Sequence, residues 1–151
     1  MFKSLYDKIV SQISAADIEA DTRDAAVRLA TAVLMVDVAL VDSCFDETEF
    51  DRMLQLVKVH FGLDTQQAAE LINAANAKAD ELVSVHEFTQ LLHKYLSENE
   101  KARIVSLLWQ VAYADGQLDK YEDSLVLKIS DLLYVSRGRV MRLKHDAQDI
   151  M

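Results

Sequence analysis

Two stretches of the sequence share one pattern: Val38-Ala39-Leu40-Val41-Asp42-Ser43-Cys44-Phe45-Asp46-Glu47-Thr48-Glu49 and Val111-Ala112-Tyr113-Ala114-Asp115-Gly116-Gln117-Leu118-Asp119-Lys120-Tyr121-Glu122. In both, an apolar run ends at an aspartate, and a second aspartate and then a glutamate follow at the same spacing. Self-similarity at a fixed spacing is typical of a repeated structural unit. We therefore predict two copies of a helix–acidic loop–helix unit.

The correspondence between the two copies extends beyond the acidic residues. At the same spacing, Leu54 matches Leu127 and Phe61 matches Tyr134, and dropping one residue after Phe61 matches Leu71 with Leu143. The repeat halves are approximately residues 25–77 and 98–148. We predict that they are related by a pseudo-two-fold axis, with two long apolar helices, 25–41 and 98–114, in contact at the centre.

Composition indicates an all-α, multihelical protein. The chain of 151 residues fits one domain, 1–151, and it has no proline and only three glycines. Strands need turns rich in those residues, so their scarcity favours helices. A connector is expected at 14–24, and the spacing of apolar residues predicts further helices at about 2–13, 46–61, 65–78, 84–96, 119–134 and 137–148.

The charge and the apolar pattern restrict the partners. A net charge of −9 repels phosphate backbones, so we expect no nucleic-acid binding and instead a protein partner or a homodimer. The longest apolar stretch, 29–41, is too short to span a bilayer and is interrupted by Asp37. The single cysteine, Cys44, excludes an internal disulfide, and the N-terminus has no signal-peptide pattern, so we expect a cytoplasmic protein.

Helix capping accounts for four of the six acids in the two loops. Asp46 and Glu49 occupy the N-cap and N3 positions of the following helix, and Asp119 and Glu122 do the same in the second copy. An acceptor at the N-cap with a glutamate at N3 forms a capping box. Ser97 and Glu100 give a third example.

Capping does not account for Asp42 and Asp115. Both end a helix, where the macrodipole disfavours an anion, and both lie close to further acids that repel them. A bound cation resolves both conflicts, and carboxylate oxygens suit Ca²⁺, Mg²⁺ or Mn²⁺. Two interpretations stay open: a divalent-cation site, or capping with a solvated acidic surface. The first uses three acids of the second loop and their counterparts in the first: Asp115, Asp119, Glu122, Asp42, Asp46 and Glu49.

Other motifs give weaker signals. A full EF-hand is excluded because Val111 and Tyr113 stand where the first ligands belong. His86 and His93 are expected at the surface, and Trp109 with Tyr113 in the core. A basic cluster in the last helix is expected to form a solvated face: Arg137, Arg139, Arg142 and Lys144. Both acidic loops read as exposed, which disfavours an enzyme because a reacting carboxylate needs a water-excluding pocket.

The stretch 107–122, with its Ala114-Asp115-Gly116, an apolar residue and then Glu122, resembles the signature of the TerB-like family, named for tellurite-resistance protein B. The resemblance covers roughly 25–148 and implies an all-helical fold, a cytoplasmic bacterial protein and a link to tellurite or chemical stress. It implies metal ligands at Asp115, Asp119 and Glu122, and more weakly in the first copy, where Ser43-Cys44 replaces the glycine. We expect a non-enzymatic, cation-responsive binding module; the alternative is a metal-free helical adaptor in a stress-response complex.

Overall fold

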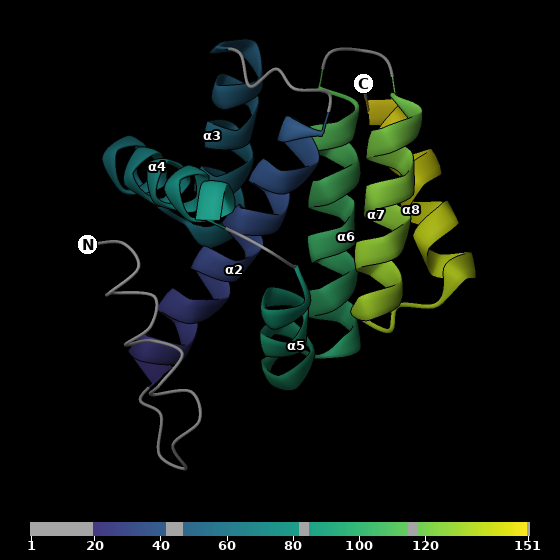
Figure 1. The fold of residues 1–151 in the computed structure, drawn as a ribbon, viewed down its shortest axis with the longest axis horizontal. Helices are drawn as coiled ribbons and strands as arrows, with labels where there is room; N and C mark the ends of the chain where they lie inside the picture. The colour runs from purple at the N-terminus through teal and green to yellow at the C-terminus, as the bar shows by residue number, and fades with distance from the viewer. Residues whose placement is uncertain (1–19, 42–46, 82–84, 115–117, 151) are drawn as a thin grey trace.

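The computed structural model describes residues 20–41, 47–81, 85–114 and 118–150. These ranges contain seven α-helices and no strand, which confirms the all-α prediction. The helices are α2 (Ala20–Leu40), α3 (Glu47–Phe61), α4 (Thr65–Glu81), α5 (His86–Tyr95), α6 (Glu98–Ala112), α7 (Lys120–Leu132) and α8 (Arg137–Ile150) (Figure 1).

The predicted helix boundaries agree with the structure to within a few residues, except at the start of α2. A connector was expected over 14–24, but α2 already begins at Ala20. The small and acidic side chains of this segment resemble a loop, yet its alanines and Arg23 favour a helix. The predicted helix at 2–13 lies outside the described residues.

Helix α2 is the centre of the molecule. Every residue from Leu29 to Val36 is buried, including Thr31, whose hydroxyl donates a hydrogen bond of 2.8 Å to the carbonyl of Val27. The helix contacts α3, α4, α5, α6 and α7 (Figure 1). A helix that is apolar on all sides must be enclosed by others, as the sequence predicts for this segment.

The contacts between helices follow the predicted duplication. In the first half α2, α3 and α4 contact one another, and in the second half α6, α7 and α8 do the same. The long helices α2 and α6 also contact each other, as predicted. Helix α5 has no counterpart, and it packs against α2 and α7. The pseudo-two-fold axis itself stays a prediction.

Helices α3 and α7 end in the same type of turn. After α3, Gly62 has φ +65° and the N–H of Leu63 donates to the carbonyl of Lys58 at 3.0 Å. After α7, Tyr134 has φ +61° and the N–H of Val135 donates to the carbonyl of Ser130 at 3.1 Å. This is the Schellman motif, with a left-handed residue after the helix.

The shared turn corrects one detail of the repeat alignment. It matches Gly62 with Tyr134, whereas the sequence comparison matched Phe61 with Tyr134. The one-residue shift therefore falls before the end of the helix and not after Phe61. The reason is that Gly62 lies 13 positions after Glu49, whereas Tyr134 lies 12 positions after Glu122.

Replacing Tyr134 by glycine is expected to stabilise the protein. A non-glycine residue in the left-handed conformation costs about 1–2 kcal/mol, and Tyr134 is 69% exposed, with a ring contact to His93 at 4.5 Å between centroids. We expect Tyr134→Gly to raise the free energy of unfolding by about 1 kcal/mol and the melting temperature by roughly 2–4 °C.

Chemical denaturation measures this change, and Gly62→Ala is its control. Gly62 has open space around its Cβ position, so alanine there meets only the backbone cost and should lose about 1 kcal/mol. A loss of stability in Tyr134→Gly would show that the contact with His93 outweighs the backbone strain.

Candidate functional site

The described candidate residues lie at one end of the helical bundle. Asp119 and Glu122 lie at the start of α7, and Glu49 lies in the first turn of α3. The starts of α3 and α7 and the ends of α2 and α6 gather at the same end of the molecule (Figure 1). Three further candidates, Asp42, Asp46 and Asp115, lie outside the described residues.

Asp119 and Glu122 form the predicted capping box. The carboxylate of Asp119 accepts the N–H of Tyr121 at 2.6 Å, and Oε1 of Glu122 accepts the N–H of Asp119 at 3.4 Å. These bonds satisfy N–H groups at the start of α7 and hold the two acidic side chains beside each other. The capping interpretation is thus confirmed for this pair.

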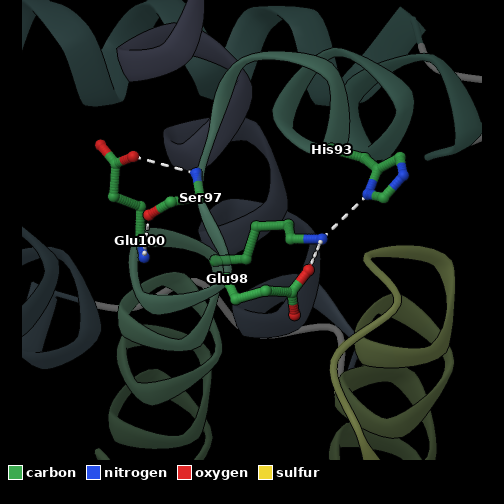
Figure 2. Close-up of polar contacts among 5 residues, drawn as sticks. His93, Ser97, Glu98 and Glu100 are labelled. Atoms are coloured by element: carbon green, nitrogen blue, oxygen red, sulfur yellow. Dashed lines mark hydrogen bonds and ion pairs between the residues drawn. The ribbon is translucent and has the colours of Figure 1, made fainter.

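Ser97 and Glu100 form the same motif at the start of α6. The Ser97 hydroxyl accepts the N–H of Glu100 at 3.2 Å, and the Glu100 carboxylate accepts the N–H of Ser97 at 2.9 Å (Figure 2). This capping box also agrees with the sequence prediction.

The two candidate glutamates that the structure describes, Glu49 and Glu122, are buried. The sequence had instead indicated that both acidic loops are exposed. Glu122 is 5% exposed and Glu49 is 9% exposed. Each lies one helical turn before a buried core residue, Val126 or Met53, so its side chain starts on the core-facing side of its helix. A buried carboxylate is tolerated only among polar or charged partners, so both positions are polar sites at the edge of the core.

The described residues alone do not form a metal centre. Among them, no three histidine, cysteine, aspartate or glutamate side chains come close enough to hold one ion. Asp119 and Glu122 supply one pair of carboxylates, and the third predicted ligand, Asp115, is outside the described ranges. The predicted cation set therefore stays a prediction.

A buried lysine is a feature that the sequence did not reveal. Lys101 is only 1% exposed, and its ammonium lies 2.9 Å from Oε1 of Glu98 and 2.9 Å from Nδ1 of His93 (Figure 2). The hydrogen bond and charge of Lys101 lower the pKa of Glu98. His86 and His93 are both exposed, as expected, but His93 also links α5 to α6 through this contact.

The basic cluster of α8 is only partly a solvated face. Arg137 pairs with Asp131 at 3.0 Å, and Arg139 donates to Asn99 at 2.9 Å. Lys144 is half-buried, with its ammonium 2.6 Å from the Asp123 carboxylate. Three of the four basic side chains thus hold α8 to its neighbours, and Arg142 is exposed.

Trp109 and Tyr113 lie in the core, as predicted. Trp109 also connects α6 to α8, because its indole N–H donates to the carbonyl of Val140 at 3.2 Å. No helix in the described part of the chain is long and apolar enough to cross a membrane.

These features define a class of small all-helical proteins with two central helices in contact and an acid-capped helix start beside them. A family model described as tellurite resistance protein TerB matches residues 28–145, and because this is most of the chain, the protein belongs to the TerB family. Membership makes it a module associated with tellurite resistance. Neither the curated proteins nor the solved structures gave a match.

Proposed function

We propose that the protein is a non-enzymatic binding module that responds to a divalent cation held by Asp115, Asp119 and Glu122. The observation that carries this proposal is the reciprocal capping of α7, which holds the carboxylates of Asp119 and Glu122 beside each other. Side chains already fixed lose little conformational entropy when they bind an ion. Ca²⁺, Mg²⁺ and Mn²⁺ all prefer such oxygen ligands.

The cation has a structural consequence in this proposal. Asp115 follows the end of α6, and Asp119 begins α7, so one ion bound by both ties the two helices together. It also neutralises a like-charge cluster at the helix end that the macrodipole makes unfavourable for Asp115. The first half has a matching set of proposed cation ligands, which are Asp42, Asp46 and Glu49.

In the cell, ion binding sets the angle between α6 and α7 and thereby the surface offered to a protein partner in the tellurite stress response. Asp119 and Glu122 accept hydrogen bonds from backbone N–H groups, so they act as structural acceptors rather than as proton donors. This use supports a binding role rather than catalysis.

A second candidate is a metal-free helical adaptor. The observation in its favour is that capping alone explains the geometry of Asp119 and Glu122, because Ser97 and Glu100 make the same motif on α6. In that case the loops supply caps and negative charge, and the partner binds elsewhere, such as at the exposed Arg142 on α8.

Calorimetry with Ca²⁺, Mg²⁺ and Mn²⁺ on the whole chain distinguishes the two. For a cation module, we expect wild-type protein to bind at least one ion and Asp115→Asn to bind it about tenfold more weakly or worse, since even loss of a supporting group costs that much. At a hundred times Kd, the ion should stabilise the wild type by about 2.7 kcal/mol, which raises the melting temperature by roughly 5–10 °C.

Two further variants sharpen this test. Asp119→Ser keeps an N-cap acceptor but removes the carboxylate, so it should weaken ion binding without unfolding α7. Asp146→Asn removes an exposed acid of α8 and should bind the ion like wild type. No heat and no melting shift for the wild type would contradict the cation module and favour the adaptor, for which Arg142→Glu should abolish partner capture.

A further inference from the structure

A pocket of about 480 Å³ is lined by residues near the starts of α2 and α6. These helix starts lie at the opposite end of the molecule from the starts of α3 and α7 (Figure 1). The walls of the pocket come from the N-terminal halves of α2 and α6 and from the C-terminal ends of α3 and α5. Arg103 in this wall lies roughly 15 Å along α6 from the end of the helix, so the pocket is separate from the proposed cation loop. This volume falls in the range of pockets that hold small organic ligands.

The pocket concentrates positive charge in a chain of net charge −9. Three arginines line it: Arg23, Arg28 and Arg103. Within the described residues, none of the three guanidinium groups forms a hydrogen bond or an ion pair. Their donors are therefore available to a ligand.

Two acids also line the wall, so the three arginines leave it with a small net positive charge. The two acids are Asp24 and Glu100, and the Glu100 carboxylate accepts the N–H of Ser97 at 2.9 Å while remaining within electrostatic range of Arg103 and Arg23. Hydrogen bonds with Ser97 lower the pKa of Glu100, and the charges of Arg103 and Arg23 lower it further.

The pKa of His60, at the end of α3, is lowered by burial and is also affected by the positive charge of this wall, since the charge of Arg103 lowers it further. The imidazole therefore adds a neutral ring to the wall, and its edge packs against Phe61 at 4.6 Å between centroids.

The rest of the wall is apolar and aromatic. Val27, Phe61, Tyr95, Leu96 and Ile104 all line the pocket. An inorganic anion would leave most of this surface and volume empty. A ligand with a non-polar body as well as a negative group can contact both the apolar and the charged parts of the wall.

We propose that this pocket binds a small organic phosphate, with the phosphate at Arg28 and Arg103 and the non-polar body against Phe61 and Tyr95. Arginine recognises phosphate and carboxylate through paired N–H donors. The guanidinium groups of Arg28 and Arg103 together offer more N–H donors than one carboxylate can accept, which favours the three-oxygen phosphate. This site is independent of the cation loop.

Calorimetric titration of the whole chain with phenyl phosphate, in buffer without divalent cations, tests the proposal. We expect phenyl phosphate to bind about tenfold more tightly than inorganic phosphate, because the ring buries apolar surface, and more tightly than benzoate. Arg28→Gln and Arg103→Gln should each weaken binding about tenfold, the loss of one charge-assisted contact.

Arg142→Gln is the matched control, because it removes an exposed arginine of α8 outside the pocket and should bind phenyl phosphate like wild type. Circular dichroism confirms that each variant is folded. Absence of phenyl phosphate binding to the wild type, or equal weakening in all three variants, would overturn the site. Equal affinity for inorganic phosphate would overturn the role of the apolar wall, and tighter binding of benzoate would overturn the preference for phosphate.

Discussion

Replacing Trp109 by alanine is expected to lower the free energy of unfolding by about 3–5 kcal/mol. The indole is 0% exposed, and its N–H donates to the carbonyl of Val140 at 3.2 Å. The ammonium of Lys144 lies 5.3 Å from the ring, so the side chain joins α6 to α8 by burial, hydrogen bonding and a cation–π contact. Denaturant titration should show the loss, with a fall in melting temperature of roughly 10 °C or more.

Two controls separate these contributions. Trp109→Phe keeps most of the apolar volume and loses the N–H donor, so a smaller loss of about 1–2 kcal/mol is expected. Tyr121→Ala removes an aromatic ring that is already exposed and should change stability by no more than about 0.5 kcal/mol. If Trp109→Ala behaved like Tyr121→Ala, the packing of α8 on α6 would not depend on Trp109.

Reversing the charge of Lys101 is expected to have an effect of similar size. In the wild type its buried ammonium lies 2.9 Å from both the Glu98 carboxylate and the His93 ring. Lys101→Glu places a second carboxylate in this buried position, and an uncompensated buried charge costs about 3–5 kcal/mol. Lys101→Met keeps the apolar stem and should change stability by no more than about 1 kcal/mol, measured by urea denaturation.

The acid side of the pH profile checks the same contact. Lys101 lowers the pKa of Glu98 in the folded protein below its ordinary value of 4.5. The unfolded chain therefore takes up the proton first, and the stabilisation present above pH 4.5 is lost as the pH falls through the folded-state pKa. Lys101→Met should lose less stability than wild type in this acid range, and parallel profiles would contradict the ion pair.

Local sequence signals predicted most of the scaffold. The apolar pattern of 25–41 placed α2 in the centre. The spacing of Ser97 with Glu100 and of Asp119 with Glu122 predicted both capping boxes. These features succeed because they depend on neighbours within one or two helical turns. The left-handed turn at Tyr134 was missed because its sequence lacks the usual glycine.

Features that depend on contacts between distant helices were not predictable. Arg23, Arg28 and Arg103 come from separate parts of the chain, and only the packing of α2 against α6 brings them to one pocket. The ammonium of Lys101 likewise meets His93 across two helices. The net charge of −9 predicted that the protein binds cations, and it gave no indication of a pocket lined by three arginines.

The proposed cation site is tested most directly by anomalous X-ray scattering from crystals of the whole chain grown with Mn²⁺. We expect an anomalous peak at the start of α7, with carboxylate oxygens of Asp115 and Asp119 at about 2.0–2.6 Å, the range of hard-cation ligands. Crystals of Asp115→Asn should lack that peak. Ordered Asp115, Asp119 and Glu122 side chains with no peak between them in the wild type would contradict the cation site.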